Sequence, residues 1–236
     1  MNTFGNGMPV MQGGMPVAGD QNLTGNDMST MPLQEENNNE VVAQDIDRIE
    51  TRKIKQILDL DYHQYESQTE RRKKDIILGK LQNIITEWIQ QCGRRQELNQ
   101  ETIMKSGGKI FTFGSFKKGV NGPGSDIDTL VVAPRHIDRK RDFFGELAPM
   151  LKNTPEVTEL TEVREAAVPV IKMKFSGVDI DMLFARVEYK EVGKDMQNLL
   201  DDNILRECDE YTIRSLNGCR VTEMTLKFVE KNLEAF

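Results

Sequence analysis

The most informative part of the sequence is residues 113–133, which read FGSFKKGVNGPGSDIDTLVVA. A strand expected at 109–113 ends in the pair Gly114-Ser115, which opens a short helix. Such a pair offers unhindered backbone amides, a hydroxyl donor and the positive end of a helix dipole, all of which are ligands for phosphate. Most isolated Gly-Ser pairs are ordinary strand ends, so the residues that follow decide between the two interpretations.

Asp126 and Asp128 stand two residues apart where the next strand begins. Residues at this spacing point to the same face of a strand, so their carboxylates are expected to lie close together. Like charges this close raise one pKa unless a cation lies between them. An isolated Asp-x-Asp is more often an exposed turn, but the strand expected at 128–133 is apolar enough to be central and buried. The pair is therefore expected at the end of a sheet, where a buried strand begins.

A second acidic pair, Asp179 and Asp181, lies on another expected strand, and Asp181 follows Asp128 by 53 residues (181 minus 128). Acidic pairs within apolar strands are unfavourable unless they hold a divalent cation, and hard oxygen ligands near phosphate suit Mg2+. Two metal ions held by three carboxylates beside a phosphate-binding pair are typical of phosphoryl or nucleotidyl transfer. One ion lowers the pKa of the attacking hydroxyl, and the other stabilises the leaving phosphate oxygens.

Other common catalytic sites have no support in the sequence. It contains no Gly-rich loop ending in Gly-Lys-Ser/Thr and no kinase signature. The two histidines, His63 and His136, fall outside any motif and are expected at the surface. A histidine-based hydrolase is therefore not expected.

The elements around these motifs mix helices and strands. Apolar periodicity predicts helices at 40–60, 67–91 and 142–151, and helical spacing from about residue 194 onward. Further strands are expected at 157–163, 168–175 and 178–184, the last two joined by a turn at Ser176-Gly177. The second helix begins with four basic residues, which are interpreted as a solvent-exposed face rather than a targeting signal or an RNA-binding patch: Arg71, Arg72, Lys73 and Lys74. The fold class is α+β.

The composition limits the class of protein. The formal net charge of the 236 residues is -7, from 31 Lys+Arg and 38 Asp+Glu, so any contact with a polynucleotide is expected to be local. No apolar run approaches the ~20 residues needed to cross a bilayer, the first thirty residues lack a secretory signal, and the three cysteines show neither paired nor metal-ligand spacing. We expect a soluble protein of an intracellular, reducing compartment, with no membrane partner.

Three motifs, in order along the chain, resemble those of one family. They are FGSFKKGVNGPGSDIDTLVV, VPVIKMKFSGVDIDMLFA and RSLNGCRVTEM, and the likeness covers about residues 45–236. The chain is similar to the nuclear eukaryotic poly(A) polymerases of the DNA polymerase β-like nucleotidyltransferase superfamily. The resemblance implies a nucleotidyltransferase fold, with a mixed β-sheet, flanking helices and the start of a helical middle domain. It also implies transfer of AMP from ATP to RNA 3′ ends in mRNA polyadenylation, in the nucleus, with mRNA 3′-end processing proteins as partners.

The resemblance assigns roles to individual residues. Asp126 and Asp128 would bind both metal ions, Mg2+ or alternatively Mn2+, and Asp181 would complete the site near the primer hydroxyl. The ATP triphosphate would be held by Gly114 and Ser115, with Phe113 beside them. Lys172 matches a position that approaches RNA, although an exposed strand lysine is nearly as good an interpretation. Asn217 would contact the nucleotide, with a helix C-cap as the alternative interpretation. Asp179 would either lie next to the metal ligands without touching the ions or lie at the surface.

The expected organisation has three parts. Residues 1–39 hold half of the 12 methionines and no Lys or Arg, and are expected to form a disordered tail. Residues 40–205 would form the catalytic domain, and 206–236 would begin a middle domain that relatives continue well past Phe236, so ATP selectivity and processive RNA binding are not expected of these residues alone. Related activities, namely uridylyl transfer or oligoadenylate synthesis, and a non-catalytic truncated paralogue that binds an RNA-processing partner remain alternatives. The loop Gly122-Pro123-Gly124 favours the poly(A) type.

Overall fold

The computed structural model describes residues 33–60 and 64–231. Among the described residues, those up to Arg52 and those from Lys53 onward belong to two separate units, and helix α1 (Leu33–Leu60) spans the boundary between them. The helix begins seven residues before the expected boundary at residue 40. Residues 1–32 of the expected tail lie outside the described residues. Within the described ranges, no helix is both long and apolar enough to span a bilayer.

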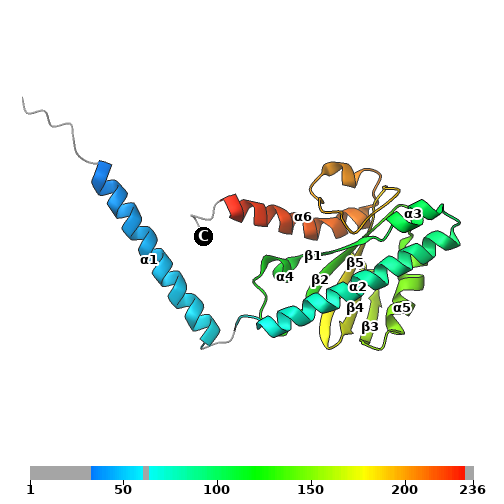
Figure 1. Ribbon diagram of the computed structural model, residues 1–236, viewed down its shortest axis with the longest axis horizontal. Coiled ribbons are helices and arrows are strands. Elements are labelled where there is room, and N and C mark those ends of the chain that lie inside the picture. Colours follow the sequence, from blue (N-terminus) through cyan, green and yellow to red (C-terminus); the bar gives the residue numbers. More distant parts are fainter. Residues whose placement is uncertain (1–32, 61–63, 232–236) are drawn as a thin grey trace, which may run out of the picture. The chain divides into compact units, whose positions relative to one another are not determined.

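A mixed five-stranded sheet forms the centre of the larger unit, with strand order β1-β2-β5-β4-β3 (Figure 1). The strands are β1 (Lys109–Thr112), β2 (Ile127–Ala133), β3 (Val157–Val163), β4 (Val170–Phe175) and β5 (Val178–Arg186). Strands β2 and β5 run parallel, and the other neighbouring strands pair antiparallel. The turn between β4 and β5 is confirmed at Ser176-Gly177, whose φ angles are both positive, 50° and 80°. This arrangement confirms the α+β class with a mixed sheet.

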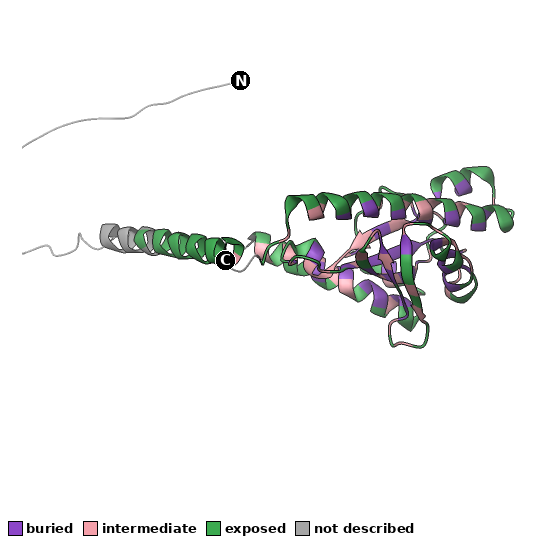
Figure 2. Ribbon diagram, turned by 90° about the horizontal axis from the view of Figure 1, so that it is seen from below, coloured by how far each residue is buried: buried purple, intermediate pink, exposed green. Residues whose placement is uncertain are grey.

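One face of the sheet is covered by α2 (Gln68–Arg95), the π-helical turn η1 (Arg139–Leu147) and α5 (Ala148–Lys152). Alternate strand residues point into this core, so buried positions on β4 and β5 recur largely with period two. Strand β2 is buried at nearly every position, because both of its faces are covered. The largest side chains of the core include Trp88, Phe143, Phe175 and Phe184. Figure 2 shows the buried residues on the strands and on the helix sides that face them.

The opposite face is covered by α6 (Glu210–Lys231) and by the segment 187–205, which includes the short 3-10 turn η2 (Asp202–Leu205). A second apolar cluster joins them to alternate residues of β2 and β5, among them Leu130 and Ala185. Helix α6 begins after Asp209, whose carboxylate accepts the backbone N–H of Thr212 at 2.6 Å and a bidentate contact from Arg139. Of the two lysines of β4 on this face, Lys172 is exposed and Lys174 is half-buried. The sheet therefore has one fully covered face and one that is open toward β4 and β3.

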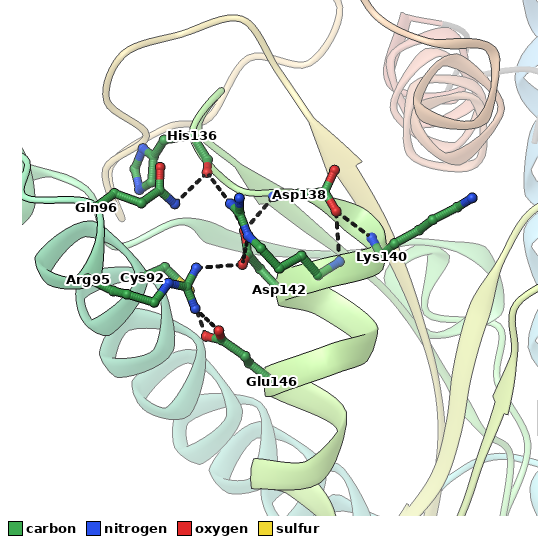
Figure 3. Close-up of polar contacts among 9 residues, drawn as sticks. Cys92, Arg95, Gln96, His136, Asp138, Lys140, Asp142 and Glu146 are labelled. Atoms are coloured by element: carbon green, nitrogen blue, oxygen red, sulfur yellow. Dashed lines mark hydrogen bonds and ion pairs between the residues drawn. The ribbon is translucent and has the colours of Figure 1, made fainter.

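A buried carboxylate joins η1 to α2 (Figure 3). Asp142 has no exposed side-chain surface, and it accepts hydrogen bonds from Arg95 at 2.7 Å, from Arg141 at 2.7 Å and from the backbone N–H of Asp138 at 2.7 Å. Arg95 also contacts Glu146, one turn further along. The helix expected at 142–151 thus starts at Arg139, because the Asp138 side chain caps its first turn.

Candidate active site

The parallel pairing of β2 with β5 sets the geometry of the site. Because the two strands run in the same direction, their first residues meet at one edge of the sheet. The register pairs Asp128 with Asp181 and, across the antiparallel neighbour β4, Asp181 with Lys172. All three side chains point to the open face, as expected from the alternation along each strand.

Three carboxylates converge at this edge. Asp126, Asp128 and Asp181 each place an oxygen within 4.8 Å of the other two. Asp126 is exposed, and the other two are half-buried. Burial raises the pKa of Asp128, and the negative charges of Asp126 and Asp181 raise it further, whereas Lys172 acts in the opposite direction. A cluster of three like charges with hard oxygen donors fits a divalent cation such as Mg2+.

Lys172 contacts the Asp181 carboxylate directly, and this hydrogen bond raises the pKa of the lysine. Asp179 lies two residues before Asp181 and faces the same way, but it is paired instead with Lys174, at 3.7 Å, on the opposite strand. Lys174 also bonds Glu159 at 3.2 Å. The structure thus places Asp179 in an exposed surface network next to the three-carboxylate cluster.

The Gly-Ser pair opens α4 (Gly114–Lys118) directly after β1, as expected. Gly114 has φ +64°, and an added Cβ would lie 2.2 Å from Asp128 Oδ2, so the close approach of the two segments requires glycine. The Gly114 amide donates to the Thr222 hydroxyl of α6 at 3.2 Å. The start of α4 is thereby held between the carboxylate cluster and α6.

Phe113 directly precedes α4, and Asn217 lies on α6, the helix against which the Phe113 ring packs. Gly218 allows the Phe113 ring to pack against α6, since an added Cβ would lie 2.8 Å from the ring. Asn217 precedes Gly218 and is exposed. The alternative that Asn217 is a C-cap is wrong, because α6 continues for many residues beyond it to Lys231.

The sequence interpretation missed several neighbours of the site. Lys74, expected on a solvated face, is only 3% exposed. The signal was present, because Lys74 precedes the buried Ile77 and Leu81 by three and seven residues on the same face of α2. Thr222 follows Gly218 by four residues and lies one turn further along α6.

The expected surface position of the two histidines is a separate point. His136 is half-buried rather than at the surface, and burial lowers its pKa. His63 lies outside the described residues.

Comparisons with known proteins identify the family of this chain. The family model described as poly(A) polymerase nucleotidyltransferase domain matches residues 39–229. The chain is 46% identical over 170 residues to a poly(A) polymerase of Dictyostelium discoideum, which covers 72% of this chain and 21% of that protein. It is 45% identical over 192 residues to nuclear poly(A) polymerase 1 of Arabidopsis thaliana, which covers 81% of this chain and 26% of that protein. The chain therefore spans about a fifth to a quarter of the length of these two relatives.

Among solved structures, the polymerase core of TRAMP, an RNA surveillance complex, matches with 26% sequence identity and a TM-score of 0.40. That match covers 55% of this chain and 36% of the solved chain.

Proposed function

The chain belongs to the family of poly(A) polymerase nucleotidyltransferase domains, and from this premise we propose that it transfers AMP from ATP to the 3′ hydroxyl of RNA without a template. The observation that carries the proposal is the convergence of Asp126, Asp128 and Asp181 at one edge of the sheet. Their position beside the Gly114-Ser115 turn supports a site where phosphate and metal ligands act together.

The three carboxylates would hold divalent cations, Mg2+ or alternatively Mn2+. When bound, such ions lower the pKa of an attacking hydroxyl and stabilise the charge that develops on phosphate oxygens. Asp126 and Asp128 would serve both ions, and Asp181 would serve the one nearest the primer. Half-burial of Asp128 and Asp181 limits competition from water for these oxygens.

The turn after β1 would receive the triphosphate of ATP. The Ser115 hydroxyl and the adjoining backbone amides are hydrogen-bond donors, and Gly114 leaves no side chain between them and Asp128. Phe113 and Asn217, on facing elements, would contact the nucleotide beside its phosphates. Lys172 is exposed on the open side of the cluster, where its charge would favour the approach of an RNA primer.

The names of two relatives, nuclear poly(A) polymerases of Arabidopsis thaliana, support a nuclear location. In the nucleus, the chain would act on mRNA 3′ ends together with 3′-end processing proteins.

Primer extension tests the proposal. The 236-residue chain is incubated with an oligo(A) primer, Mg2+ and each of the four NTPs separately. We expect extension with ATP in the presence of Mg2+ and none in EDTA, and no strong selection among the four NTPs by these residues alone. Asp128→Ala should reduce the rate by several powers of ten. A bound metal ion stabilises the transition state by several kcal/mol, and each power of ten in rate corresponds to about 1.4 kcal/mol of activation free energy. Preferred extension with UTP would indicate uridylyl transfer, and a variant rate within roughly tenfold of the parent would contradict a metal site at Asp128.

A further inference from the structure

A buried lysine lies at the start of α2, next to the candidate active site. The Lys74 side chain is 3% exposed, and its Nζ lies 2.6 Å from Glu66 Oε1 and 3.2 Å from Ser125 Oγ. The Glu66 side chain is 6% exposed, so the two charges form a buried ion pair. Removing one member of such a pair leaves an uncompensated buried charge, whereas removing both is often tolerated.

Ser125 directly precedes Asp126, at the end of the loop that connects α4 to β2. This loop, residues 119–125, contains three glycines, two of them with positive φ angles of 71° and 68°. Within it, Ser125 N–H donates to the carbonyl of Gly122 at a long 3.3 Å. Because glycine has many accessible backbone conformations, the loop itself restricts the position of Asp126 only weakly. Contacts from outside the loop must supply the restriction.

Helix α2 contacts the chain on both sides of this loop, in α4 before it and at Ser125 at its end. One turn before Lys74, the Arg71 guanidinium donates to the carbonyl of Phe116 at 3.2 Å and lies 4.0 Å from the centre of the Phe116 ring. Phe116 follows Ser115, the expected triphosphate ligand, just as Ser125 precedes Asp126. From one face of α2, Arg71 therefore holds a backbone carbonyl next to the Gly114-Ser115 turn, and Lys74 holds the side chain of Ser125 next to the first carboxylate.

We propose that Lys74 is a positioning residue, which fixes Asp126 relative to the Gly114-Ser115 turn by holding Ser125 from the buried face of α2. The inference rests on the proposed function, since it gives Lys74 a role in that same site. Lys74 touches neither the nucleotide turn nor the carboxylates, so it acts through Ser125. Glu66 neutralises the lysine within the apolar interior and fixes its direction.

The test combines a metal-binding readout with stability. The affinity of the full chain for Mn2+ alone is measured, together with the Mg2+ concentration for half-maximal primer extension and the melting temperature. Ser125→Ala removes the acceptor and keeps the ion pair, so it should weaken Mn2+ binding and raise the Mg2+ requirement by about tenfold or more, as is usual for residues that orient metal ligands. Its melting temperature should stay within about 3 °C of the parent.

Lys74 itself is tested with three variants and a control. Lys74→Met should lose both metal affinity and stability. The double variant Glu66→Met/Lys74→Met should regain stability but not metal affinity, because neither residue then holds Ser125. Lys74→Arg should retain most of the affinity, since it keeps a charged donor. The matched control is Lys73→Met, an exposed neighbour, which should change nothing.

Parent-like Mn2+ affinity in both Ser125→Ala and the double variant would overturn the proposal. A loss of affinity that only follows the fraction of unfolded protein would overturn it as well. Mn2+ binding does not depend on adenylate transfer, so a parent that binds Mn2+ without extending a primer would contradict the proposed function and still test the role of Lys74.

Discussion

Gly114 and Asp128 approach so closely that a methyl group on residue 114 would lie 2.2 Å from Asp128 Oδ2. The contact joins the Gly114-Ser115 turn to the carboxylate cluster, and the positive φ of Gly114 adds strain for any other residue. We predict that Gly114→Ala lowers the rate of primer extension by about a hundredfold or more, because a displacement of about 1 Å in an active site can cost that much. Steady-state extension rates at saturating ATP measure the effect.

Gly119 provides a matched control, because it ends the same helix with φ +71° but has no atom within 4 Å of an added Cβ. Gly119→Ala carries the same kind of backbone strain without the contact with Asp128. We expect a loss of stability of about 1–2 kcal/mol and little change in rate. Equal losses of rate in the two variants would mean that backbone strain, rather than the contact with Asp128, is responsible.

A second pair of variants distinguishes the two aspartates of β5. Asp181→Asn should reduce transfer by several powers of ten, since Asp181 is the register partner of Asp128 and belongs to the carboxylate cluster. Asp179→Asn should stay within about threefold of the parent, because it removes only an exposed pair with Lys174. Primer extension by both proteins at one Mg2+ concentration gives the comparison. The reverse order of rates would place the third metal ligand at Asp179.

Much of the sheet was predictable because its strands are short, apolar and bounded by turn residues. The strand expected at 157–163 has the observed bounds, and the strand expected at 178–184 ends only two residues early. The strand expected from residue 168 begins at Val170, just after Pro169, which cannot donate a hydrogen bond to a neighbouring strand. The acidic pairs were recognisable because charges within apolar strands are unfavourable without a ligand.

The contacts between distant segments were not predictable from local patterns. Nothing near Lys74 in the sequence indicates that Glu66 and Ser125 surround it, because that environment depends on how α2 packs against the loop before β2. The bond from Gly114 to Thr222 likewise joins residues 108 positions apart. A pattern of polar and apolar residues reports which face of a helix is buried, but not the partner that it meets.

The thiols are expected to be unreactive in the folded chain. Burial raises the pKa of Cys92 to about 11 and that of Cys219 to about 12, and it also raises the pKa of Cys208. Since the thiolate is the nucleophile, a thiol-specific reagent at pH 8 should label Cys92 and Cys219 at least a hundredfold more slowly than free cysteine, roughly as the thiolate fraction requires, and should also label Cys208 more slowly than free cysteine. The half-buried Cys208 should react first, and urea should release all three. Immediate labelling of Cys92 or Cys219 would contradict the packing of α2 or α6.

The buried carboxylate of Asp142 is predicted to stabilise the fold in a pH-dependent way. Burial alone would raise the pKa of Asp142, but hydrogen bonds from Arg141, from the Asp138 backbone and from Arg95 outweigh it and lower the pKa below the ordinary 3.8. Asp142→Ala should reduce the free energy of unfolding at pH 7 by about 1–3 kcal/mol, because it leaves the backbone N–H of Asp138 without its acceptor and removes the carboxylate shared by the partly exposed Arg95 and Arg141. Urea denaturation measures the loss. The exposed pair of Glu101 with Lys105 provides the control, and Glu101→Ala should cost at most about 0.5 kcal/mol.

The sign of the pH effect follows from the lowered pKa of Asp142. Above the ordinary pKa the carboxylate is charged in both the folded and the unfolded chain, and the folded state gains its full stabilisation. As the pH falls below about 4, the unfolded chain takes up the proton first, so the contribution decreases until the folded carboxyl is also protonated. The difference in unfolding free energy between the parent and Asp142→Asn should therefore be constant from pH 7 to about 5 and shrink toward pH 3. A difference that stayed constant down to pH 3 would show that Asp142 stabilises η1 by shape and hydrogen bonding rather than by its charge.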